Sequence, residues 1–228
     1  MPGNDLDESC RFVGAALARA LLEFNKTALC FLLYCIPMSS RDTSRYRLTS
    51  NLRKGRISLF CARYFVTCVA KCTQKSMIES IPAQGIMNVI NGMKKGGDID
   101  LLCGTIMPNH VHLLTALTEK LSIGQVVGKF KSLTRSFLSE HGMRWQRNYF
   151  EHRLRPDDRA SHYARYIFLN PYRAGLVPRK TEWPYWIYYA NVDFDFIAFL
   201  EDRRYPPEEW LNASLETLGV NPQYIGND

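Results

Sequence analysis

Residues 99–117, IDLLCGTIMPNHVHLLTAL, decide the fold of this chain. The stretch holds two apolar runs, 99–107 and 111–117, with Pro108 and Asn109 between them. Pro and Asn are typical turn residues, and short runs rich in Ile, Leu, Val and Thr are typical of strands. The stretch therefore predicts two β-strands that follow each other directly along the chain.

The segments on either side extend this pattern. Residues 63–71 are rich in β-branched and aromatic side chains and predict an earlier strand. Apolar positions within 76–95 suit a helix that the following Gly-Gly pair would end. Residues 121–140 show helical spacing with basic side chains opposite, and 161–170 predict another short helix. This order predicts an α+β, ferredoxin-like fold: an antiparallel sheet with helices on one face.

The length of 228 residues suits one domain with additions. We expect an N-terminal extension over residues 1–54, which is apolar and then basic, a single domain over 55–190, and a C-terminal tail over 191–228. The basic polar stretch after Met38 is typical of a true amino terminus. Residues before Met38 are therefore expected either to form a short amphipathic helix or to lie outside the native protein.

The apolar N-terminal region does not read as a membrane segment. Its unbroken apolar run, residues 28–36, has nine residues, whereas a helix needs about twenty to span a bilayer. The chain also starts with acidic residues, unlike the basic start of a signal peptide. We expect no membrane association and a cytoplasmic location.

The charge of the chain points to a polyanionic partner. It carries 29 Lys and Arg against 22 Asp and Glu, a formal net charge of +7. Between residues 129 and 180, twelve basic residues occur with four acidic ones, and aromatic residues are interspersed. Cations neutralise phosphates and aromatic rings stack on unpaired bases, so the mixture suits single-stranded or structured nucleic acid. A solvated basic face above core aromatics accounts for the same composition equally well.

The first candidate site is His110-Val111-His112. On a strand, both imidazoles point to one face and Val111 to the other. Two neutral imidazoles can hold a divalent ion, but the site needs a third ligand from elsewhere in the chain. A pair of half-exposed histidines is the commoner outcome for such a pattern.

The second candidate site lies in residues 162–171, HYARYIFLNP. On a helix, Tyr166 and Asn170 are neighbours on one face, with Ile167 and Phe168 on the opposite, core-facing side. Pro171 disfavours a helical Asn170, so we expect the helix to stop there. A phenol and an amide on an accessible face suit a nucleophile and a metal ligand. A surface tyrosine and a capping asparagine fit the same pattern.

Together these stretches resemble the REP-associated tyrosine transposases, a branch of the single-tyrosine HUH transposases. The resemblance runs from about Gly55 to Trp186. It rests on five motifs in chain order: GRISLFCARYFVTC, MPNHVHLL, NYFEHRLR, YARYIFLNPYRAGLV and EWPYW.

The resemblance implies the HUH transposase fold and a role for each candidate. His110 and His112 would bind a divalent metal, Mg²⁺ or Mn²⁺, and Asn170 would be its third ligand. Tyr166 would be the catalytic nucleophile, with Arg165 expected to help lower its pKa. The implied function is a metal-dependent single-stranded DNA endonuclease and strand-transferase that acts on hairpin, REP-like palindromic DNA through a 5′-phosphotyrosine intermediate.

The implied partner is single-stranded or hairpin DNA, for a protein that is cytoplasmic and nucleoid-associated, and a monomer rather than a homodimer. Candidate DNA-binding residues are the cations of the basic segment: Lys129, Lys131, Arg135, Arg144, Arg147, Arg153, Arg155, Arg159, Arg165 and Arg173. Two alternatives stay open. One is a catalytically silent DNA-binding regulatory protein of the same fold, and the other is an RNA-binding protein with a similar sheet.

Overall fold

The structure is a computed structural model, and it describes residues 58–71, 76–189 and 192–225. The N-terminal extension expected over residues 1–54, including the start expected near Met38, lies outside the described residues. None of the helices in the described ranges is long and apolar enough to cross a membrane.

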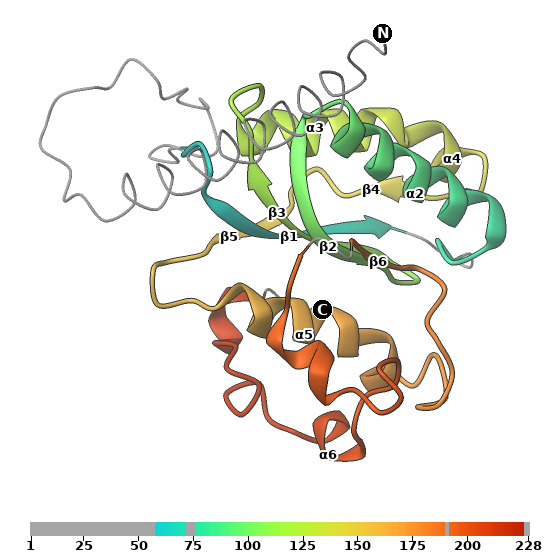
Figure 1. Cartoon of the computed structure of the whole chain (residues 1–228). Helices are drawn as coiled ribbons and strands as arrows, with labels where there is room; N and C mark the ends of the chain where they lie inside the picture. The colour runs from blue at the N-terminus through green and yellow to red at the C-terminus, as the bar shows by residue number, and fades with distance from the viewer. Residues whose placement is uncertain (1–57, 72–75, 190–191, 226–228) are drawn as a thin grey trace, which may run out of the picture. The chain divides into compact units, whose positions relative to one another are not determined.

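The described domain is built on a six-stranded antiparallel sheet (Figure 1). The strand order is β4-β1-β3-β2-β6, and β5 pairs with β1 beside β4. The strands are β1 (Arg63–Lys71), β2 (Ile99–Ile106), β3 (His110–Leu117), β4 (Arg144–Trp145), β5 (Phe150–Arg153) and β6 (Trp186–Tyr188).

The stretch that decides the fold forms the centre of this sheet. β2 and β3 make a hairpin through Pro108 and Asn109, and the Met107 N–H donates to the His110 carbonyl at 2.8 Å. β3 begins at His110, one residue earlier than predicted, and pairs with β1 on its other side. The motif with the two histidines is therefore held between neighbours on both sides.

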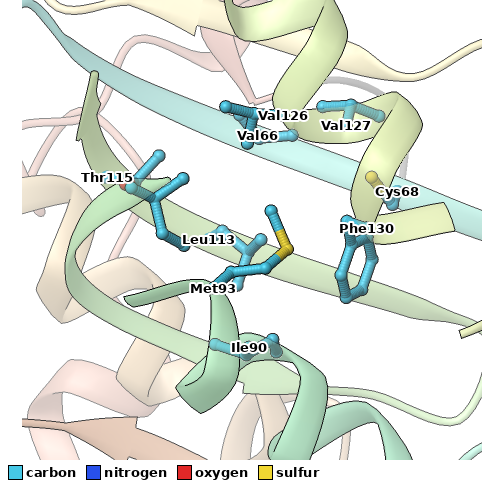
Figure 2. Close-up of a pocket in the computed structure, with 10 residues that line it drawn as sticks. Val66, Cys68, Ile90, Met93, Leu113, Thr115, Val126, Val127 and Phe130 are labelled. Atoms are coloured by element: carbon cyan, nitrogen blue, oxygen red, sulfur yellow. The ribbon is translucent and has the colours of Figure 1, made fainter. Parts of the chain in front are cut away.

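Helices α2 (Ser80–Lys95), α3 (Ile123–Leu133) and α4 (Arg135–Ser139) cover one face of the sheet (Figure 1). Side chains of α2, α3 and the three central strands β1, β2 and β3 pack around a small apolar cavity that Figure 2 shows. The single helix predicted over 121–140 is interrupted at Thr134, whose hydroxyl donates to the Phe130 carbonyl at 2.7 Å. The predicted α+β fold, with an antiparallel sheet and helices on one face, is confirmed by this layer.

A further layer covers the other face of the sheet. It consists of α5 (Ala160–Arg173), η1 (Asp195–Phe199), α6 (Glu208–Leu211) and η2 (Pro222–Tyr224) (Figure 1). Phe65 and Leu114 of the sheet pack here against Ile167 of α5. The central strands are almost entirely buried along their length, and strands that are apolar on both faces need a cover on each side. This layer goes beyond the helices predicted for one face.

Gly104 of β2 is needed because the backbone of β3 passes close to it. A Cβ at this position would lie 2.9 Å from the His112 carbonyl oxygen, which cannot move away without shifting β3. We expect Gly104→Ala to lower the free energy of unfolding by about 1–3 kcal/mol, measured by urea denaturation. The control is Gly92→Ala at an exposed position of α2, where no atom lies within 4 Å of the added Cβ. Equal unfolding midpoints for the two variants would contradict this account.

Candidate active site

The two histidines of β3 lie side by side on the face of the sheet that α5 covers. Both side chains point to the same face, as the strand alternation predicts, and their Nε2 atoms are 3.0 Å apart. His110 is 5% exposed and His112 is fully buried, so neither is the half-exposed residue of the alternative interpretation. Thr67 of β1 and Thr105 of β2 flank His112 in the strand register.

The other ring nitrogen of each histidine is held by a neighbouring side chain. His112 Nδ1 lies 2.9 Å from the Thr67 hydroxyl, and His110 Nδ1 lies 2.7 Å from the Asn109 amide oxygen. An amide oxygen only accepts, so His110 Nδ1 donates to it, and the Nε2 atom of a neutral His110 would be an acceptor. Burial, and secondarily the proximity of His110, hold the pKa of His112 well below its ordinary value. His112 is therefore a neutral imidazole at pH 7.

Helix α5 brings the second candidate site to the same place. The Asn170 Nδ2 atom lies 3.2 Å from His112 Nε2. The Tyr166 ring packs edge-on against the His112 ring, with centroids 5.7 Å apart. Phe65 contacts both of these rings. Residues separated by more than fifty positions in the sequence thus form one cluster.

Two expectations for α5 are wrong. Tyr166 is 4% exposed and Asn170 is 9% exposed, so they do not lie on an accessible face. The reason is that the C-terminal segment and the sheet together enclose the helix. The helix also continues through Pro171 to Arg173. A proline this near the end removes only one backbone donor, and the Ala174 N–H still bonds the Asn170 carbonyl.

The geometry of this cluster suits a divalent cation. Two ligands about 2.1 Å from an ion and at right angles lie about 3.0 Å apart, which is the separation of the two Nε2 atoms. A half-turn of the Asn170 amide would present its oxygen as a third ligand. The Thr105 hydroxyl oxygen beside His112 is buried and has no hydrogen-bond partner among the described residues. The described ranges contain no group of three or more His, Cys, Asp or Glu suited to a metal, so a metal site built from these residues would depend on the Asn170 amide.

Residues 58–168, which contain both histidines and Tyr166, match the family model described as Transposase IS200 like. This match identifies an IS200-like transposase domain within the chain.

Two similar proteins bear related names. A REP-associated tyrosine transposase of Escherichia coli is 22% identical over 121 residues, which cover 52% of this chain and 72% of the relative. A Haemophilus influenzae protein provisionally given the same name is 28% identical over 120 residues, covering 46% and 62%. A solved REP-associated tyrosine transposase bound to a REP hairpin is 21% identical, with a TM-score of 0.49 over 60% of this chain and 82% of its own.

Several of the predicted DNA-binding cations lie away from the two histidines. Lys129, Lys131 and Arg135 belong to the α3–α4 layer on the opposite face of the sheet. Lys129 Nζ lies 2.6 Å from Asp98, and Lys131 Nζ donates to two backbone carbonyls at 2.8 Å.

The two predicted cations of α5 contact the C-terminal segment. Arg165 Nη2 donates to the Leu218 carbonyl at 2.7 Å, and its guanidinium lies over the Trp210 ring. Arg173 donates to the Ala213 carbonyl at 2.9 Å. The Arg165 guanidinium thus contacts the C-terminal segment. This placement does not support the expectation that Arg165 lowers the pKa of Tyr166. The remaining five candidates are all exposed: Arg144, Arg147, Arg153, Arg155 and Arg159.

Sequence reasoning missed the residues that orient the imidazoles. The sequence pattern places Thr67 and Phe65 in a strand and Asn109 in a turn, with no further role. The alternation in β1 places Thr67 and Phe65 on one face, but only the pairing register identifies that face as the one with the histidines. Asn109 directly precedes His110, and this adjacency is the signal that was available.

Proposed function

We propose that this chain is a metal-dependent single-stranded DNA endonuclease and strand-transferase that acts on hairpin, REP-like palindromic DNA. The observation that carries the proposal is the meeting of Tyr166 and Asn170 of α5 with the histidine pair of β3. The match of residues 58–168 to a transposase family model supports the reaction class.

His110, His112 and Asn170 would hold Mg²⁺ or Mn²⁺, and the bound ion would polarise the scissile phosphate and offset charge on its oxygens. The neutral His112 and the Nδ1 partners of both histidines would orient the rings so that both Nε2 atoms face this point. Fixing a ring in this way orients a metal ligand and raises its basicity.

Tyr166 would be the nucleophile. Its phenolic oxygen forms a bond to phosphorus while the bond from phosphorus to the 3′ oxygen breaks. The phenol gives up its proton, and the leaving oxygen takes one up as a 3′-hydroxyl. The 5′ end stays on the tyrosine, and the reverse reaction with another 3′-hydroxyl joins strands. Because Tyr166 is almost fully buried, the side chains that surround it must move before DNA can contact its hydroxyl.

DNA contact would fall mainly to the exposed arginines between residues 144 and 159. The names of the two relatives state an association with REP sequences. We propose that the substrate of this chain is likewise REP-like DNA, folded as a hairpin. A monomer in the cytoplasm, associated with the nucleoid, is the proposed working form.

The burial of Tyr166 favours a second candidate function, a catalytically silent DNA-binding regulator. A cleavage assay separates the two. Hairpin oligonucleotides with single-stranded flanks and labelled ends are incubated with the protein and Mn²⁺ or Mg²⁺. We expect an upstream product with an extendable 3′-hydroxyl and a downstream fragment linked to the protein through its 5′ phosphate, both absent with a chelator. Binding without either product would favour the regulator.

The Thr67 hydroxyl on His112 provides a test of the metal site alone. We expect Thr67→Val to weaken Mn²⁺ binding by about 10–100-fold, because it removes the group that orients the imidazole. Titration calorimetry measures the affinity without any DNA. The control Thr67→Ser keeps the hydroxyl and should bind nearly as the wild type does. Equal affinity of all three proteins would exclude this role for Thr67.

A further inference from the structure

An open groove lies at the edge of the sheet where β1, β4 and the β2–β3 turn meet. Its lining includes Val69 and Lys71 of β1, Asn109 of the turn, and Arg144 and Gln146 of the β4 region. Of its lining residues, Arg144 is among the arginines to which DNA contact is assigned above.

The groove adjoins the histidine pair through the strand register. Val69 is the direct cross-strand partner of His110. Val69 and Lys71 alternate with Ala70, so they share the sheet face of Thr67 and the histidines. Asn109 belongs to both sites, since it lines the groove and its Oδ1 atom accepts from His110 Nδ1 at 2.7 Å.

Two cationic side chains of the groove lie opposite each other on neighbouring strands. Lys71 and Arg144 are direct cross-strand partners, so their side chains project from the same face of the sheet. Both are exposed, and neither forms an ion pair with another described residue. Like charges directly opposite each other on a sheet are destabilising, and an anion between them would remove that cost.

The remaining lining suits a nucleotide rather than a simple anion. Gln146 contributes an amide side chain next to Arg144, and amides hydrogen-bond base edges. Val69 contributes partly exposed apolar surface. An open groove with cations, amides and apolar surface offers contacts to phosphate and to base at once.

We infer that this groove binds the stretch of single-stranded DNA adjoining the scissile phosphate, with Lys71 and Arg144 contacting its backbone. This inference rests on the proposed function for the identity of the strand. Asn109 links the groove to His110, so a strand bound there lies next to the metal site.

The test measures binding without chemistry. A fluorescein-labelled oligothymidylate of about 16 nucleotides is titrated with the full chain in a chelator, at several salt concentrations, with fluorescence anisotropy as the readout. The variants are Lys71→Gln, Arg144→Gln and the double variant. Lys95→Gln with Lys180→Gln is the matched control, because both residues are exposed cations outside the groove lining.

We expect the double variant to bind at least about tenfold more weakly at low salt. The slope of log affinity against log salt should fall by about 0.7 for each lost phosphate contact. The control double variant should keep the affinity and slope of the wild type. Wild-type affinity and slope in the Lys71/Arg144 double variant would overturn the inference, as would equal losses in the control or no binding by the wild type.

Parallel cleavage assays on the labelled hairpin keep the two proposals distinguishable. Cleavage by the wild type, with oligothymidylate binding unchanged in the groove variants, removes the groove and leaves the proposed function. Weaker binding by the groove variants, with no cleavage by the wild type, supports the groove and removes the endonuclease.

Discussion

Tyr166→Phe is expected to abolish DNA cleavage and the covalent protein–DNA product while leaving hairpin binding close to that of the wild type. The change removes one oxygen and keeps the ring that packs against His112 and Phe65, so the fold should be retained. Loss of a catalytic nucleophile typically costs several orders of magnitude in rate, and we expect a loss of at least about a thousandfold. Denaturing gels with end-labelled hairpins measure both products.

Tyr163→Phe is the matched control for this experiment. Tyr163 lies one turn earlier on α5, but burial, followed by the proximity of Asp158, raises its pKa. A phenol with a raised pKa stays protonated and is a poor nucleophile. Cleavage should therefore persist in this variant. Retention of the covalent product in Tyr166→Phe, or its loss only in Tyr163→Phe, would assign the nucleophile to another residue.

His110→Ala is expected to remove metal binding and, with it, cleavage. Loss of a group that only supports a metal ligand already costs about 10–100-fold in affinity, so loss of a ligand should weaken Mn²⁺ binding by more than about 100-fold. Titration calorimetry measures the affinity and the hairpin assay measures the rate. His110 is a better target than His112, because His112 is fully buried and its removal would leave a cavity in the core.

His141→Ala is the control for loss of a histidine. His141 bonds the Phe137 carbonyl at the end of α4 and lies outside the candidate active site. This variant should bind Mn²⁺ and cleave as the wild type does. Unchanged Mn²⁺ affinity in His110→Ala would exclude the imidazole pair as the metal site.

The features that could be predicted from the sequence are those with a strict local period. The alternation in His110-Val111-His112 places two imidazoles on one face whatever surrounds the strand, and the structure has their Nε2 atoms 3.0 Å apart. The strand–turn–strand pattern of residues 99–117 likewise identifies the central hairpin of the sheet, because the turn residues lie directly between two apolar runs of strand length.

The features that were missed depend on what covers each element. Helical spacing puts Tyr166 and Asn170 on one face of α5, but it does not show that this face packs on the sheet and is buried. The sequence also does not show that residues 208–225 return to cover α5. In that contact Arg165 donates a hydrogen bond to the Leu218 carbonyl. A cation predicted to bind DNA therefore packs against the C-terminal segment.

The most direct test of the active site is identification of the amino acid that carries DNA after reaction with a hairpin. The covalent product is digested with nuclease and trypsin, and the modified peptide is sequenced by mass spectrometry. Trypsin cuts after Arg165, so the peptide that begins at Tyr166 also contains Tyr172, and its fragments separate the two tyrosines. We predict a nucleotide attached to Tyr166. A nucleotide on Tyr172 or on any other residue would contradict the site built from α5 and the β3 histidines.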